Sequence, residues 1–217
     1  MDIHFSKKIL SFFYPITIKK VVNNKNQNIF LQLYRNQWML STNDAIYSFG
    51  TFYTPFRQSF KKIKKEIASI DSFLLLGTGL GSALKILQTK YHIFPKSTLV
   101  DNDKNIIDLS VDYMNLNSKK NVEWVCSDAI SFLENNNKKF DLIGIDVFYG
   151  MLMPKDYKQE IFFKICSKSL NKNGHCIFNM ILNSSNEKMI IAQRLKSVFS
   201  SVLEINFKQN TFFICKY

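Results

Sequence analysis

The chain has 217 residues, of which 46% are hydrophobic, and a formal net charge of +12. This length is enough for one α/β core with a small appendage, and no run approaches the roughly 18 to 20 apolar residues that cross a bilayer, which excludes a membrane-spanning segment. The four cysteines are 10 to 40 residues apart, so we expect reduced thiols in a cytoplasmic protein, without a zinc site or a disulfide framework.

The positive charge is concentrated at the front of the chain. Residues 1–70 contain 11 Lys and Arg against 3 acids, whereas the remainder contains 18 against 14. Such an asymmetry can mark a surface for nucleic acid or an acidic partner. Because no arginine-rich or aromatic-interleaved motif accompanies it, we interpret the lysines as solvated and do not expect a nucleic-acid partner. The histidines show no paired spacing, so no metal is expected.

The first 55 residues predict short strands joined by tight turns. Alternating apolar residues favour strands over 16–22, 29–34, 38–40 and 45–49, with a turn at 23–28. The apolar run at 9–14 is expected to pack on the core as a strand or short helix rather than to act as a signal peptide. After Pro55 the apolar spacing becomes helical and predicts one amphipathic helix with a buried stripe of Phe56, Phe60, Ile63, Ile67 and Ile70.

Beyond Ser72, strand and helix patterns alternate along the chain. Strands are predicted within 73–76, 97–100, 122–126, 140–145 and 176–181, and helices over 81–91, 104–115, 129–135, 155–170 and 186–199. Two more strands, 201–207 and 211–216, close the chain as an antiparallel pair. We therefore predict an α/β fold with a mostly parallel, Rossmann-like sheet over residues 56–217, preceded by a β-hairpin region over 1–55. The antiparallel last strand favours a methyltransferase-type sheet over a dehydrogenase.

The segment FLLLGTGLGS, residues 73–82, is typical of a buried strand that turns sharply into a helix beside a nucleotide-like ligand. Gly77, Gly79 and Gly81 can adopt a positive φ and let the backbone approach a flat ligand closely. We predict that the three glycines bind a cofactor. Glycine turns also occur in loops without any ligand, so that alternative stays open at this point.

Polar residues follow the next three predicted strands. Asp101 and Asn102 end the second strand, where a carboxylate can accept bonds from ribose hydroxyls. The third strand is followed by Ser127, Asp128 and Ala129, where Asp128 could accept a bond from an adenine amino group. The fourth ends at Asp146, the candidate catalytic base. The alternatives are solvated loop acids at these strand ends and, for Asp146, a capping or ordering role in the loop 147–154.

These segments resemble the spermidine synthase family, which lies within the class of S-adenosylmethionine-dependent methyltransferase folds. The resemblance is carried by LGTGLGS, by LVDNDKNII around Asp101, by Ser127-Asp128-Ala129, by Asp146 and by the hairpin-like segment 39–47. It implies S-adenosylmethionine or its decarboxylated form as cofactor, a small-molecule acceptor, a homodimer formed through the front hairpins, and a role for Asp146 in deprotonating or orienting an amine.

Three positions depart from the family pattern around the substrate. Leu80 stands in the glycine loop where the family has an acid, Tyr149 replaces the second aspartate of the catalytic loop, and Tyr47 stands at the place of a substrate-facing glutamine. A polycation needs negative partners in a low-dielectric pocket. On this ground we expect methyl transfer from S-adenosylmethionine to a small molecule, with Tyr47 and Tyr149 lining the acceptor pocket. The alternatives are a polyamine aminopropyltransferase and a non-catalytic binding module with a basic front half.

Overall fold

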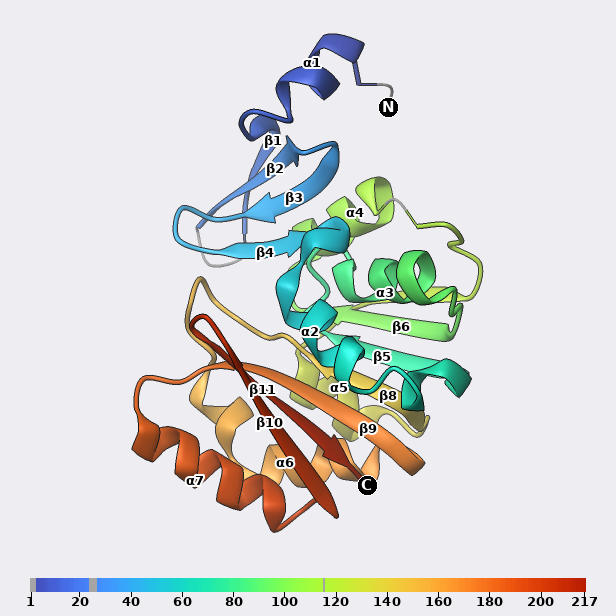
Figure 1. Ribbon diagram of the computed structural model, residues 1–217, viewed down its shortest axis with the longest axis vertical. Coiled ribbons are helices and arrows are strands. Elements are labelled where there is room, and N and C mark those ends of the chain that lie inside the picture. The colour runs from blue at the N-terminus through green and yellow to red at the C-terminus, as the bar shows by residue number, and fades with distance from the viewer. Residues whose placement is uncertain (1–2, 24–26, 115) are drawn as a thin grey trace.

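The computed structural model describes residues 3–23, 27–114 and 116–217, with a small antiparallel sheet beside a larger α/β body (Figure 1). The small sheet has the order β1-β2-β3-β4. Its strands are β1 Ile16–Val22, β2 Asn28–Tyr34, β3 Gln37–Ser41 and β4 Ile46–Phe49. They confirm the four predicted strands to within one residue at each end. The predicted turn at 23–28 lies partly outside the described residues, because 24–26 are not among them.

The larger sheet has seven strands in the order β10-β11-β9-β8-β5-β6-β7. Strands β5 to β9 run parallel, and β11 is antiparallel both to β9 and to β10. This arrangement confirms the predicted α/β class and the antiparallel closing pair. The bounds are β5 Ser72–Leu76, β6 Lys96–Asp101, β7 Val122–Cys126, β8 Phe140–Ile145, β9 Leu170–Ile181, β10 Ser201–Phe207 and β11 Asn210–Lys216.

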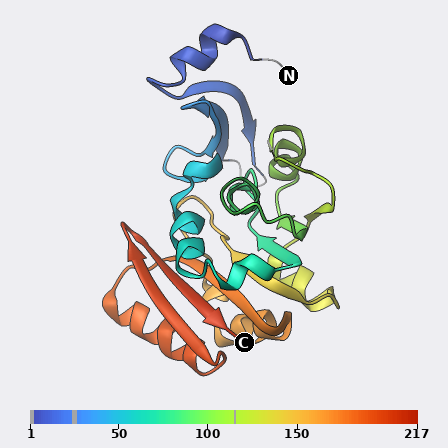
Figure 2. The same ribbon diagram turned by 45° about the vertical axis from the view of Figure 1, so that its right-hand side comes forward.

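A helix follows each of the five parallel strands, as is usual for the crossover connections between parallel strands. These helices are α3 Ser82–Ile86, α4 Lys104–Tyr113, α5 Ala129–Asn135, α6 Glu160–Lys168 and α7 Ser185–Lys196. Two of the predicted helices are divided into segments: a π-helical turn, Leu87–Tyr91, continues α3, and a separate 3-10 turn, Lys155–Lys158, precedes α6. The described helices are all too short or too polar to cross a bilayer. In both views the small sheet lies at one end of the molecule and α6 and α7 lie at the other (Figures 1 and 2).

The helix predicted over 56–70 is broken in the structure. It begins as α2 Thr54–Lys62, leaves helical geometry at Ile63 (φ −112°, ψ 37°), and resumes as a 3-10 turn over Glu66–Ser69. Ile63 and Ile67 stay buried all the same. Four lysines, at 61, 62, 64 and 65, repel one another at helical spacing, which disfavours a continuous helix there. The apolar stripe therefore predicted the buried face correctly but not the break.

The expectation that residues 9–14 pack on the core is wrong. The short helix α1, Phe5–Leu10, contributes no buried residue, and Phe5 and Phe13 are 74% and 78% exposed. Figure 1 shows the reason, because α1 precedes β1, the outermost strand of the small sheet, and lies on the side away from the large sheet.

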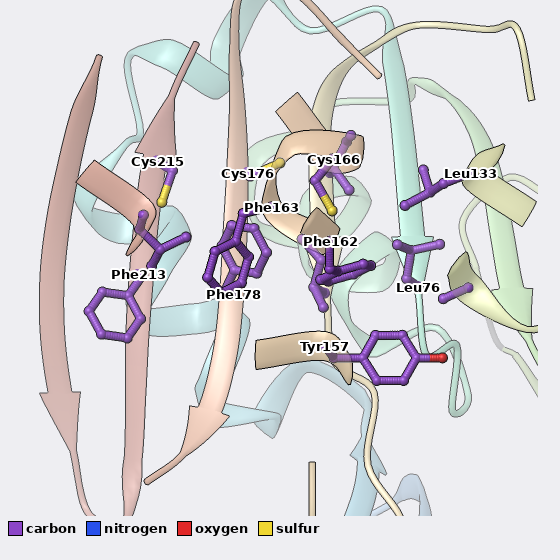
Figure 3. Packing of buried hydrophobic residues seen from close by; sticks show 14 of the residues in the cluster. Leu76, Leu133, Tyr157, Phe162, Phe163, Cys166, Cys176, Phe178, Phe213 and Cys215 are labelled. Atoms are coloured by element: carbon purple, nitrogen blue, oxygen red, sulfur yellow. The ribbon is translucent and has the colours of Figure 1, made fainter. Parts of the chain in front are cut away.

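Apolar side chains fill both faces of the large sheet. One cluster joins the sheet to α6, where the rings of Phe162 and Phe163 each lie edge-on to Phe178 of β9 (Figure 3). Cys166, Cys176 and Cys215 are buried there as free thiols. The opposite face is covered by α2 and α3. A third cluster packs the small sheet against α4 and includes Leu80 of the glycine loop, 4% exposed. This cluster fixes the small sheet over the carboxyl ends of the parallel strands.

Candidate functional site

A cavity of about 370 Å³ opens at the carboxyl ends of β5, β6 and β8. Its wall is completed by the small sheet, by the loop after β8 and by the β10–β11 hairpin. Open α/β sheets bind their ligands at this edge. The structure brings nine of the predicted site residues into this wall, namely Tyr47, Gly77, Gly79, Asp101, Asn102, Ser127, Ala129, Asp146 and Tyr149. Within the described residues, the wall includes neither Gly81 nor Asp128.

The two glycines in the wall are required by close contacts between chain segments. Gly77 has φ +82°, and a Cβ there would lie 2.2 Å from the carbonyl oxygen of Asp146. Gly79 has φ +50°, and a Cβ there would lie 2.9 Å from the carbonyl oxygen of Tyr47. Both positions therefore favour glycine for conformation and for space. The glycine turn brings the loop after β8 and strand β4 together around the cavity.

Gly81 and Asp128 have structural roles beside the cavity. Gly81, with φ +65°, begins helix α3 and contacts the side chain of Met114. Asp128 caps α5, because its Oδ1 accepts from the backbone N–H groups of Ile130 and Ser131. Its Oδ2 accepts from the hydroxyl of Tyr157, which lines the cavity. Both carboxylate oxygens of Asp128 therefore already have hydrogen-bond donors within the protein. The adenine contact predicted for Asp128 stays a prediction.

Asp101 connects the end of β6 to the glycine turn. Its Oδ2 accepts from the backbone N–H of Thr78 at 3.0 Å and its Oδ1 from the backbone N–H of Asp103 at 3.2 Å. Burial raises the pKa of Asp101 to about 6, and the backbone hydrogen bonds oppose that rise. A carboxylate can accept more than two hydrogen bonds, so these contacts orient Asp101 and leave it able to accept from ribose hydroxyls.

Asp146 follows β8 and carries two hydrogen bonds from buried donors. The hydroxyl of Tyr53 donates to its Oδ2 at 2.8 Å, and the side-chain amide of Asn179 donates to its Oδ1 at 2.7 Å. Burial raises the pKa of Asp146 to about 6, and both hydrogen bonds oppose the rise. Burial also raises the pKa of Tyr53, as does the nearby Asp146 charge, so this hydroxyl stays a donor. A carboxyl poised near neutral pH suits general base catalysis.

The loop after Asp146 forms a tight turn over the cavity. Tyr149 and Leu152 exchange backbone hydrogen bonds of 2.8 and 3.0 Å around Gly150. Two side chains hold this turn in place: the hydroxyl of Tyr47 accepts from the backbone N–H of Gly150 at 2.6 Å, and the amide of Asn102 donates to the hydroxyl of Tyr149. Tyr47 and Tyr149 both line the cavity and both fix the loop, while the acceptor contact expected of them stays a prediction.

The polar wall residues that were not identified as site residues from the sequence include Asp44, Tyr53, Asn179 and Asn210. Asp44 lies against the turn after β8, because a Cβ on Gly150 would be 2.6 Å from its Oδ2. Of the described wall residues, four are acidic, namely Asp44, Asp101, Asp103 and Asp146, and one, Lys208, is basic. Only Asn179 left a signal, as a polar residue inside the apolar run CIFNMI. No cluster of potential metal ligands is present in the described ranges.

Comparison with known proteins gives consistent matches. A family model described as spermine/spermidine synthase domain matches residues 57–217. The polyamine aminopropyltransferase of Buchnera aphidicola subsp. Acyrthosiphon pisum is 28% identical over 138 residues, which are 60% of this chain and 48% of that protein. The chain thus spans about half the length of this curated relative.

Two solved structures share the fold. A probable spermidine synthase from Corynebacterium glutamicum has a TM-score of 0.76 and 20% identity, covering 94% of this chain and 81% of its own. A spermidine synthase in complex with the transition state analogue AdoDATO has a TM-score of 0.69 and 13% identity, covering 93% and 72%. These findings confirm the resemblance and the fold expected from the sequence.

The expectation of methyl transfer is wrong. The matching domain model and the curated relatives concern polyamine aminopropyl transfer. Leu80 and Tyr149 misled the prediction, because acids in the wall can come from other segments. Asp44, from the turn between β3 and β4, lies against Gly150 in the same loop as Tyr149. The cavity is therefore acidic although two expected acids are absent.

Proposed function

The chain belongs to the spermine/spermidine synthase domain family, and on that premise we propose that it is a polyamine aminopropyltransferase that uses decarboxylated S-adenosylmethionine. The observation that carries the proposal is the half-buried Asp146 carboxyl, which is held by two hydrogen bonds and shares one cavity with the glycine turn and Asp101. Gly77, Gly79, Asp101, Ser127 and Ala129 are proposed to hold the nucleoside. The acceptor is an amine, with the diamine putrescine as the first candidate.

Decarboxylated S-adenosylmethionine would supply a sulfonium group and hence a good leaving group. The acceptor nitrogen forms a bond to the aminopropyl carbon, the carbon–sulfur bond breaks, and methylthioadenosine leaves. The protein has two tasks: to align the amine and to take its proton. Asp146 is proposed to take the proton, since its carboxyl is ionised above about pH 6. Tyr53 and Asn179 keep its two oxygens in a fixed orientation.

Asp44 is proposed to bind an ammonium group of the donor or the acceptor. It lines the cavity beside the turn at Gly150, and its Oδ1 accepts from the hydroxyl of Thr42 at 2.7 Å. An oriented carboxylate in the same cavity as Asp146 would offset part of the desolvation of a second positive charge. The aromatic residues Phe49, Phe52 and Phe148 in the wall would contact the methylene chain between the charges.

Calorimetry with the two nucleosides tests the proposed donor. We expect decarboxylated S-adenosylmethionine to bind more tightly than S-adenosylmethionine, because the acidic wall favours a ligand without a carboxylate. Incubation with putrescine should then yield spermidine and methylthioadenosine by mass spectrometry. Tighter binding of S-adenosylmethionine would contradict the proposed donor. If neither nucleoside binds at millimolar concentration, a non-catalytic role gains support.

Removal of the Asp101 carboxylate is expected to weaken nucleoside binding about tenfold, the equivalent of one charge-assisted hydrogen bond. The variant is Asp101→Ala and the measurement is calorimetric titration with methylthioadenosine at pH 8. Asp112→Ala, at an exposed position of α4, is the matched control and should bind normally. Affinity of the wild type should also fall below about pH 6, where Asp101 becomes protonated. Unchanged affinity in Asp101→Ala would refute the ribose assignment.

A further inference from the structure

Asn179 lies between Asp146 and a third polar side chain, that of Asn210. The side-chain nitrogen of Asn179 donates to Asp146 Oδ1 at 2.7 Å, and its side-chain oxygen accepts from Asn210 Nδ2 at 2.8 Å. Asn179 is 1% exposed, so bulk water cannot replace either partner. Buried polar groups of this kind are costly unless they are hydrogen-bonded. The contacts therefore connect the end of β8, strand β9 and strand β11 in one row.

The direction of this row follows from the chemistry of its members. An ionised carboxylate only accepts, which places the N–H groups of Asn179 toward Asp146 and leaves its oxygen facing Asn210. Both amides thus donate in the direction of Asp146. Hydrogen bonds aligned in this way polarise one another, and each strengthens the next. The row stabilises the negative charge on Asp146.

Asn210 is placed by the closing hairpin. It is the first residue of β11, where it pairs with Ile181 of β9 and with Phe207 of β10. Its neighbours Lys208 and Gln209, at the hairpin turn, also line the cavity. The side chain of Asn210 therefore joins the hairpin to Asp146, although the two residues are far apart in sequence.

We infer that Asn179 and Asn210 are positioning residues that keep Asp146 an oriented carboxylate, Asn179 by direct contact and Asn210 through Asn179. The inference rests on the proposed function for its catalytic meaning, while the state of the Asp146 carboxyl can be measured in the free protein. The other carboxylate oxygen of Asp146 accepts a hydrogen bond from the hydroxyl of Tyr53. The remaining titratable groups of the described cavity wall are Asp44, Tyr47, Asp101, Asp103, Tyr149, Tyr157 and Lys208.

Carbon-13 NMR titration of aspartate carboxyls in the unliganded protein tests the inference, with the Asp146 signal assigned by its absence in Asp146→Asn. Asn210→Ala should raise the pKa of Asp146 by about half a unit, because the polarising partner of Asn179 is lost. Asn179→Ala should raise it by about one unit, because a hydrogen bond to the charge itself is lost. Asn210→Gln retains an amide, so the pKa of Asp146 in this variant should lie closer to the wild-type value than in Asn210→Ala.

Asn206→Ala is the matched control on the same hairpin. Asn206 forms hydrogen bonds with Lys188, Glu204 and Thr211, and none of its described bonds reaches Asn179 or Asp146. Its loss therefore perturbs the hairpin and should leave the pKa of Asp146 unchanged. A lower Tm in Asn210→Ala with an unshifted Asp146 pKa would overturn the inference, because the amide would then have only a structural role. Because Asn210 is only half-buried, Asn210→Ala still tests the inference should Asn179→Ala not fold.

Kinetics supply the second readout. If the wild-type protein transfers aminopropyl groups, Asn210→Ala should lower kcat severalfold and leave KM for the acceptor unchanged. The acid limb of its pH profile of kcat should move to higher pH by the shift in pKa seen in NMR. A rise in KM for the acceptor together with the fall in kcat, without any movement of the acid limb, would count against a positioning role. If the wild type transfers no aminopropyl group, the proposed function fails while the NMR titration still decides the positioning of Asp146.

Discussion

Asp146→Asn is expected to lower kcat for aminopropyl transfer by about 10²- to 10⁴-fold, the usual contribution of a positioned base. The amide keeps the size of the side chain and can still bond Tyr53 and Asn179, so the fold and the cavity should survive. The negative charge and the capacity to take a proton are removed together. Initial rates at saturating donor and acceptor measure the effect, and binding of methylthioadenosine reports on the integrity of the site.

Asp112→Asn, on the exposed side of α4, makes the same chemical change away from the cavity and should leave kcat unchanged. The pH profile adds an independent criterion. The pKa of Asp146 is raised by burial to about 6, so the base is ionised above pH 6 and protonated below it. We expect kcat to fall about tenfold per unit below pH 6. An Asp146→Asn enzyme within about threefold of wild type would exclude Asp146 as the base.

The strand ends could be predicted from the sequence because they depend on local patterns. Apolar runs followed by Gly77, Asp101 and Asp146 mark where buried strands stop, and parallel strands bring their carboxyl ends to one edge. The positions of these residues around one cavity follow from that topology. The division into residues 1–55 and 56–217 stays a proposal. The third apolar cluster packs the small sheet directly on α4.

Contacts between distant segments could not be predicted in the same way. Tyr53 reaches Asp146 across 93 positions of sequence, and the partner of Asn179 belongs to a hairpin 31 residues later. Neither distance leaves a periodic signal. The failed expectation of methyl transfer has the same origin, since Asp44 joins the cavity wall from a turn that reads only as a hairpin connection.

Leu80 illustrates how a departure from a family pattern can reflect packing. In the sequence, Leu80 stands where the family has an acid in the glycine loop, and this absence argued against an amine-binding site. In the structure it is buried with Ile29 and Leu31 of the small sheet and with Ile106 of α4. Burial of its methyl groups stabilises the fold, whereas a buried carboxylate at this position would require a hydrogen-bonding or positively charged partner. The position thus contributes to holding the small sheet over the cavity.

Gly77→Ala is expected to cost about 2 to 4 kcal/mol of the free energy of unfolding and to weaken nucleoside binding more than about tenfold. A residue with a Cβ at φ +82° is strained by about 1 to 2 kcal/mol. The Cβ would also lie 2.2 Å from the carbonyl oxygen and 2.6 Å from the carbonyl carbon of Asp146. Both are backbone atoms, fixed by the bond from Asp146 N–H to Leu76, so the end of β8 must move.

Gly81→Ala is the control that separates collision from backbone strain. It lies in the same loop with φ +65°, but the Cβ there would meet the flexible end of the Met114 side chain, which can rotate away. Its cost should therefore stay near the conformational penalty of about 1 to 2 kcal/mol. Chemical denaturation and calorimetry on both variants measure the difference. Because only Gly77 contacts the backbone of Asp146, equal losses in the two variants would show that the close approach of these two segments does not determine the shape of the site.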